Sequence, residues 1–179
     1  MKQIVITDPH LIAEPSAWVV KHATRITKNA GVLDLACGSG RHALYLVSLG
    51  LQVTALDRDT SILRAQILPA NIHIIEADVE NAPWPFADKT FDAIVVTNYL
   101  HRPLFAKILA ALKPSGVLIY ETFAAGNEKF GKPSNPDFLL QEGELLETVR
   151  GRMRVIAYED DFFESPKPAM IQRICAIKS

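Results

Sequence analysis

Five apolar blocks of strand length recur at a steady interval through the first two thirds of the chain. They are Gly31 to Ala36, Leu51 to Leu56, Ile72 to Ala77, Phe91 to Thr97 and Gly116 to Thr122. Their near-continuous apolarity is typical of strands buried on both faces, as in a parallel sheet. Helix-like segments lie between them at residues 41–49, 60–68 and 102–112. This alternation predicts a doubly wound α/β sheet.

The last third of the chain follows a different pattern. Residues 123–136 are rich in Gly, Pro and Asn and predict a long loop, and residues 138–150 predict a helix. Two strand candidates follow, Met153 to Tyr158 and Met170 to Ile177, with no helix between them. We therefore expect these two strands to pair as an antiparallel hairpin at one edge of the sheet.

Together these segments predict a Rossmann-like, seven-stranded sheet that is mostly parallel, with one antiparallel strand from the C-terminal hairpin. The length of 179 residues suits a single domain, residues 1–179. Within it we expect an N-terminal helical segment over residues 1–30, with an amphipathic helix at residues 15–27 before the first strand. Such a segment is placed to act as a lid.

Composition excludes several classes of protein. With 49% apolar and 22% charged residues, the chain is not globally disordered, and its formal charge of -1 gives no overall attraction for nucleic acid. Cys37 and Cys175 are too few for a disulfide scaffold or a thiolate-only zinc site, and we expect no metal. No apolar run approaches the roughly 20 residues of a membrane span, and residues 1–14 lack the apolar block of a signal peptide. We expect a soluble, cytoplasmic protein.

The most informative segment is a glycine loop between a strand and a helix. The first strand runs into Gly38-Ser39-Gly40, and with Ala43 the spacing is G-x-G-x-x-A, a form of the dinucleotide-binding fingerprint. Glycines let the backbone turn sharply and approach a ligand closely. Asp57 lies 19 positions after Gly38 and ends the second strand, where its carboxylate can accept hydrogen bonds from ribose hydroxyls.

Two further carboxylates favour S-adenosylmethionine over a nicotinamide cofactor. Asp34 lies four residues before the first glycine, where it suits an ammonium and a sulfonium better than a pyrophosphate. Asp78 closes the third strand and can accept from an adenine amino group, while Val79 offers a backbone N–H. Each aspartate alone could be a cap or turn residue. All three, however, fall near the carboxyl ends of adjacent strands, where open α/β sheets bind ligands.

These residues resemble the motifs of the class I S-adenosylmethionine-dependent methyltransferases. Val32 to Gly40 resembles their first motif, Asp57 the acidic residue of the second, and Asp78-Val79 the adenine-contacting pair. The similarity continues through Pro85-Phe86 and Phe91 to Ile94, and through the turn of residues 112–116, where Ser115 replaces a usual glycine. Within the family, the chain is most similar to small single-domain enzymes that act on small molecules, including the tellurite-resistance and thiopurine-type methyltransferases.

The resemblance implies methyl transfer from S-adenosylmethionine, with S-adenosylhomocysteine as the product. It implies cofactor contacts from eleven residues: Asp34, Ala36, Cys37, Gly38, Ser39, Gly40, Asp57, Arg58, Asp78, Val79 and Asn98. The reacting methyl should lie near the end of the fourth strand. Tyr99 and His101 follow that strand and are the candidate catalytic residues, with His101 as the best available base. Alternatively, His101 opens the next helix and Tyr99 packs beneath the cofactor.

We expect the acceptor to be a small molecule, covered by the substrate loop of residues 123–136. The basic residues near the mouth of the site and the acidic cluster of residues 159–161 favour opposite acceptor charges, so the acceptor and its reacting atom stay open, as does the oligomeric state. Other hypotheses are an RNA or protein methyltransferase, a non-catalytic cofactor-binding partner subunit and a nicotinamide reductase. The first is disfavoured because there is no basic run and no Asn-Pro-Pro-Tyr or Pro-Cys motif.

Overall fold

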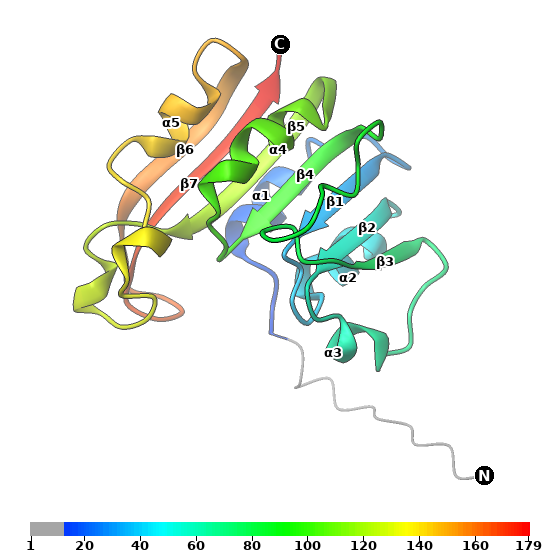
Figure 1. Ribbon diagram of the computed structural model, residues 1–179, viewed down its shortest axis with the longest axis horizontal. Coiled ribbons are helices and arrows are strands. Elements are labelled where there is room, and N and C mark those ends of the chain that lie inside the picture. The colour runs from blue at the N-terminus through cyan, green and yellow to red at the C-terminus, as the bar shows by residue number, and fades with distance from the viewer. Residues whose placement is uncertain (1–12) are drawn as a thin grey trace, which may run out of the picture.

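A computed structural model describes residues 13–179, so residues 1–12 of the expected N-terminal lid lie outside the described part of the chain. Its centre is a seven-stranded sheet in the order β3-β2-β1-β4-β5-β7-β6 (Figure 1). The strands are β1 (Gly31–Leu35), β2 (Gln52–Asp57), β3 (Ile72–Glu76), β4 (Phe91–Thr97), β5 (Leu112–Phe123), β6 (Met153–Phe163) and β7 (Ala169–Lys178). The apolar blocks of the sequence thus form the strands that they predict.

The first five strands pair in parallel, and β7 pairs antiparallel with both β5 and β6. The prediction of a mostly parallel sheet with an antiparallel strand from a C-terminal hairpin is therefore confirmed. The hairpin strands are longer than expected, because β6 continues to Phe163 and pairs there with Ala169. Only residues 164–168 remain as the connecting turn.

The helices are shorter than the sequence predicts. They are α1 (Ala17–Ala23), α2 (Arg41–Ser48), α3 (Ser61–Arg64), α4 (Phe105–Ala110) and α5 (Glu144–Val149). The expected helix of residues 138–150 begins late, because Leu140 N–H donates to the carbonyl of Phe123 and Gly143 has a left-handed φ of 71°. The helix expected at 102–112 opens as a 3₁₀ turn, Arg102–Leu104, and stops before Leu112, which pairs with Phe91. No helix in residues 13–179 is long and apolar enough to cross a membrane.

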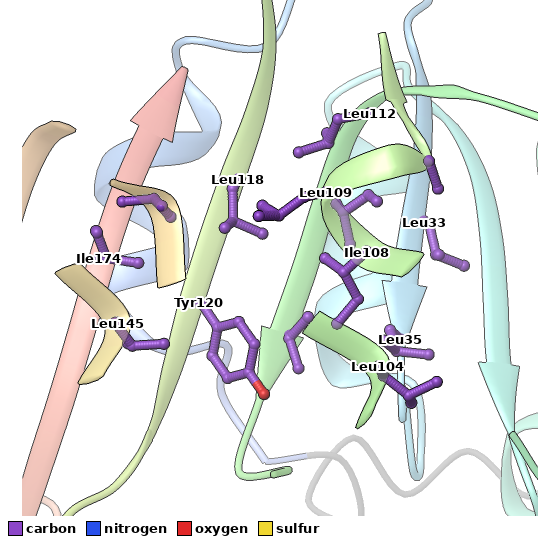
Figure 2. Close-up of a cluster of buried hydrophobic side chains, with 14 of the residues drawn as sticks. Leu33, Leu35, Leu104, Ile108, Leu109, Leu112, Leu118, Tyr120, Leu145 and Ile174 are labelled. Carbon is purple, nitrogen blue, oxygen red and sulfur yellow. The ribbon is translucent and has the colours of Figure 1, made fainter. Parts of the chain in front are cut away.

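Two apolar layers hold the helices on the sheet. In Figure 1, α4 and α5 lie in front of the sheet and α1 and α2 lie behind it. The front layer is drawn in Figure 2, where Ile108 and Leu109 of α4 and Leu145 of α5 point toward side chains of the sheet. The rear layer packs α1 and α2 against the other face around the fully buried Trp18 and Leu46. The central strands, such as β1 and β4, are therefore covered on both faces, which accounts for their nearly continuous apolar sequences.

A buried amide joins α5 to the two C-terminal strands. Gln172 of β7 is fully buried. Its Oε1 accepts from the Leu145 N–H at 2.7 Å, and its Nε2 donates to the Gln141 carbonyl at 2.9 Å and to Asp160 Oδ2 at 2.7 Å. This amide fixes where α5 begins and so where the preceding loop ends.

We expect Gln172→Leu to lower the free energy of unfolding by about 2–4 kcal/mol, because buried polar groups would lose their partners. Urea denaturation measures the change. Gln141→Leu is the matched control: its side chain is exposed, so a change within about 0.5 kcal/mol is expected. Equal losses in both variants would contradict the role given to the Gln172 amide.

Candidate functional site

The carboxyl ends of β1, β2 and β4 meet at one edge of the sheet and border a cavity of about 390 Å³. Seven residues expected from the sequence line it: Ala36, Asp57, Arg58, Asp78, Val79, Asn98 and Tyr99. Three predicted cofactor contacts, Asp34, Cys37 and Gly40, are buried and lie outside the lining. The structure therefore brings about half of the predicted cofactor set into one cavity.

The glycine loop is tied to the end of β2. Gly38 N–H donates to Asp57 Oδ2 at 2.8 Å, and Asp57 Oδ1 accepts from the Asp59 N–H at 3.1 Å. Gly38 has a φ of 54°, and a Cβ added there would meet nothing within 4 Å. The loop thus leaves open space beside Gly38, while Asp57 holds its backbone in place.

Gly40 has a different role from Gly38. Its φ is 86°, and an added Cβ would lie 2.4 Å from Cδ1 of Leu63 in α3. Gly40 therefore lets α2 begin close against α3, and it acts in packing. Ser39 is also used structurally, because its carbonyl accepts from Gln66 Nε2 at 2.9 Å.

Asp34, near the end of β1, has a buried carboxylate. It is 1% exposed, and neither of its oxygens has a hydrogen-bond partner among residues 13–179. Burial raises the pKa of Asp34 to about 7; the nearby backbone N–H of Ala43 and the charge of Arg41 oppose the rise, and the Asp57 carboxylate adds slightly to it. An unpaired buried carboxylate is costly, so its presence beside the glycine loop indicates a site that awaits a cationic partner.

Asp78 forms a turn and also lines the cavity. Its Oδ1 accepts from the backbone N–H groups of Glu80 and Asn81, and its Oδ2 accepts from Asn81 Nδ2 at 2.9 Å. These bonds hold the pKa of Asp78 below its usual range, with the side chain of Asn81 as the main cause. The turn reading and the ligand reading are compatible, because a carboxylate accepts more hydrogen bonds than these three.

Tyr99 contacts Glu80 in the wall of the cavity, and His101 lies next to Glu80. Glu80 was not among the residues predicted from the sequence. Tyr99 Oη donates to Glu80 Oε1 at 3.0 Å, and His101 Nδ1 lies 4.0 Å from Glu80 Oε2. Burial and the bond to Glu80 raise the pKa of Tyr99 above its usual range, so the phenol stays a donor. His101 caps the 3₁₀ turn and does not line the cavity. The signal for Glu80 was its place two residues after Asp78, in the same turn.

A second cavity of about 240 Å³ adjoins the first. The two share the residues Glu80, Asn98, Tyr99 and Phe138. Beyond this shared wall, the second cavity is lined by Leu100 and Thr122 and by Phe123 and Pro133 of the expected substrate loop. The loop therefore reaches the site, and Phe138, just outside it, contributes an aromatic side chain to both cavities.

Cations that the sequence suggested for the mouth of the site are engaged or absent from the cavity linings. Arg102 pairs with both carboxylate oxygens of Glu144 and donates to the carbonyls of Asp137 and Leu139. It therefore anchors the end of the loop. Cys37 is buried, and this burial raises the pKa of its thiol above the usual range, which favours the protonated form.

The described start of the chain crosses near the glycine loop. Ser16 N–H donates to His42 Nε2 at 3.1 Å, and Ser16 Oγ donates to Glu121 Oε1 at 2.7 Å. His42 Nδ1 lies 3.1 Å from Thr97 Oγ1 at the end of β4. Burial lowers the pKa of His42 to about 3, so its ring is neutral and links the chain start to the sheet.

Comparison with known proteins agrees with the resemblance seen in the sequence. Residues 32–116, which run from β1 into β5, match a family model described as a methyltransferase domain. Over this segment the chain is similar to known methyltransferases. The match covers the glycine loop, Asp57 and Asp78, the residues on which the sequence prediction depended.

Curated relatives are similar over part of their length. The chain is 33% identical over 132 residues to a malonyl-[acyl-carrier protein] O-methyltransferase of Serratia marcescens, covering 71% of this chain and 47% of that protein. It is 28% identical to a demethylmenaquinone methyltransferase of Paenarthrobacter aurescens, covering 69% and 51%. The chain spans about half the length of the curated relatives it matches.

Solved structures share the fold. TehB from Haemophilus influenzae superposes with a TM-score of 0.75 at 22% identity, covering 92% of this chain and 63% of that chain. The glycopeptide N-methyltransferase MtfA, in complex with S-adenosylhomocysteine, superposes with a TM-score of 0.64 at 21% identity, covering 93% and 91%. These likenesses concern the fold.

S-adenosylmethionine, the cofactor that the sequence motifs imply, fits the residues present. The buried Asp34 carboxylate has no partner among the described residues, which suits the ammonium of the cofactor. Open space beside Gly38 suits close approach of a ligand to backbone, and Asp57 and Asp78 provide acceptors along the first cavity.

The raised pKa of Asp34 makes a prediction about stability. Between pH 4 and 7 the folded protein retains a proton that the unfolded chain has lost, so the wild type loses stability as pH rises through this window. Asp34→Asn lacks this loss. We expect its stability relative to wild type to rise between pH 4 and 7 by on the order of 2–4 kcal/mol and to level off above.

Denaturation of both proteins across this pH range, without cofactor, measures the difference. Asp88→Asn, at an exposed position before β4, is the control and should follow the wild type. A difference between wild type and Asp34→Asn that does not change with pH would contradict the burial of an ionisable Asp34.

Proposed function

We propose that the protein is an S-adenosylmethionine-dependent methyltransferase whose acceptor is a small molecule bound in the second cavity. One observation carries the proposal: the two cavities adjoin and share Asn98 and Tyr99, at the end of β4. A cofactor bound in the first cavity and an acceptor bound in the second would meet at this wall. The small volume of the second cavity favours a small acceptor over a polymer.

Residues of the first cavity, together with the buried Asp34 outside its lining, would hold the cofactor. Asp57 would accept from the ribose hydroxyls, Asp78 and Val79 would contact the adenine, and Asp34 would pair with the ammonium. When bound, the cofactor supplies an activated methyl on a sulfonium, whose leaving group departs neutral. The protein therefore needs to align the acceptor and exclude water more than to activate a nucleophile.

The residues of the second cavity would position the acceptor. Tyr99 stays protonated, and its Oη, which donates to Glu80, can accept a hydrogen bond, while Asn98, at a left-handed φ of 53°, offers an amide to a polar group. His101 can take a proton from an acceptor that must lose one. Phe123, Pro133 and Phe138 provide apolar walls that exclude water. We assign residues 123–136 to a substrate loop and the chain start to a lid over the cofactor.

The curated relatives support small or carrier-bound acceptors, because their names specify malonyl-[acyl-carrier protein] and demethylmenaquinone. We further propose that residues 1–179 act as a single domain and that the protein works in the cytoplasm.

The proposal is tested by calorimetry and by transfer of labelled methyl. S-adenosylmethionine should bind and NAD should not, and label should reach a member of a panel of small thiols, amines, alcohols and carboxylates. Label found only in bulk RNA or protein would favour a macromolecular acceptor. Cofactor binding with no transfer to any acceptor would favour a non-catalytic subunit, and NAD binding alone would overturn the proposal.

Asp57→Ala tests the cofactor site. The variant loses an acceptor for two hydroxyls and the bond that fixes Gly38, so we expect S-adenosylmethionine affinity to fall by roughly tenfold to a few hundredfold. Titration calorimetry measures it, with Asp88→Ala as a control that should bind normally. Unchanged affinity in Asp57→Ala would mean that Asp57 only ends its strand.

A further inference from the structure

The wall of the second cavity carries a single formal charge. Among the described residues that line it, Glu80 is the only one with a carboxylate, and none is Lys, Arg or His. Tyr99 stays a neutral phenol, because burial and the bond to Glu80 raise its pKa. The remaining lining is an amide, a buried threonine hydroxyl and apolar side chains.

The Glu80 carboxylate can accept further hydrogen bonds from a ligand, because Tyr99 uses only one of its acceptor positions. Its Oε1 accepts from Tyr99 Oη, and its Oε2 lies 4.0 Å from His101 Nδ1. Arg58 lines the first cavity and not the second, and Arg102 is bound to Glu144. The neighbouring Asp57 and Asp78 add further negative charge on the side of the first cavity. An anionic acceptor in the second cavity would therefore face the Glu80 carboxylate with no cation in that cavity's lining, since Arg58 lies in the lining of the first cavity beside Asp57 and Asp78.

We propose, resting on the function proposed above, that the acceptor is an amine carried on a small apolar or aromatic body, and that Glu80 binds its nitrogen. A carboxylate accepts charge-assisted hydrogen bonds from an ammonium or amine. Phe123 and Phe138 supply flat apolar surface for the body. A cavity of about 240 Å³ lies below the 300–1,000 Å³ typical of drug-sized ligands, which restricts the body to a small one.

The step balances with groups at the second cavity. Bound as an ammonium, the acceptor gives one proton to a ring nitrogen of His101, which lies outside the cavity lining with its Nδ1 4.0 Å from Glu80 Oε2. The freed nitrogen lone pair then forms a bond to the methyl carbon, while the bond from that carbon to sulfur breaks and its electron pair stays on sulfur. The product is the N-methyl ammonium, which Glu80 still faces, and His101 returns its proton to solvent.

Three probes with one body test the class of acceptor: 2-phenylethylamine, 2-phenylethanol and phenylacetate. Their binding to the full chain saturated with S-adenosylhomocysteine is measured by calorimetry. We expect the amine to bind at least about tenfold more tightly than the other two, as a charge-assisted hydrogen bond implies. An alcohol or carboxylate that binds as tightly as the amine, or no measurable binding of the amine, overturns the inference.

Glu80→Gln tests the residue, because glutamine keeps the shape and can still accept from Tyr99. We expect amine affinity to fall about tenfold, with the affinities for 2-phenylethanol and S-adenosylhomocysteine within threefold of wild type. Asp88→Asn removes the same charge at an exposed position before β4, outside both cavity linings, and should leave amine binding unchanged. Unchanged amine affinity in Glu80→Gln, or an equal loss in Asp88→Asn, overturns the role of Glu80.

The two proposals fail in different ways. If the wild type binds no S-adenosylmethionine, or binds it and methylates nothing, the proposed methyltransferase function fails. If it methylates only RNA or protein, the small-molecule function fails as well. If it methylates small alcohols or carboxylates and discriminates against amines, the function stands and only the amine inference falls.

Discussion

Parallel pairing of β1 with β2 and β4 is the constraint on which the site depends. Leu35 is in register with Leu56 on one side and Val96 on the other, so the three strands end together. The residues at and after the end of each strand are thereby brought to one edge of the sheet. For this reason Asp57 at the end of β2, Asn98 after β4 and Ala36 after β1 line one cavity, with Gly38 bonded to Asp57 beside it.

Residues at this edge of the sheet lower the free energy of unfolding. Asp34 is buried without a hydrogen-bond partner among the described residues, and Ala36 and Asn98 have left-handed backbone angles of 57° and 53°. Unpaired carboxylates and left-handed non-glycine residues disfavour folding and cluster at functional sites. The remaining structure compensates with two full apolar layers and with fixed polar joints such as the Gln172 amide. The residues that stabilise the fold therefore lie on the two faces of the sheet, and the strained residues lie at the edge where the parallel strands end.

Sequence reasoning predicted what depends on local pattern. Continuous apolar runs identified the strands, and the spacing from Gly38 to Asp57 placed the glycine loop beside the end of β2, where the two residues are bonded. It failed where distant residues decide. From the sequence, Arg102 is one of the basic residues expected near the mouth of the site. In the structure it binds Glu144, 42 positions further along the chain, and anchors the end of the loop. Glu80 was missed because its place in the site depends on a hydrogen bond from Tyr99, which lies 19 positions further along the chain.

The central claim is that a methyl donor bound in the first cavity presents its methyl group at the wall of Asn98 and Tyr99. The most direct measurement is an NMR experiment with S-adenosylmethionine carrying a ¹³C-labelled methyl group. The account predicts nuclear Overhauser contacts from that methyl to the side chains of Asn98 and Tyr99, and none to the rear layer around Trp18. Contacts confined to any other part of the chain, or a methyl signal unchanged by the protein, would contradict it.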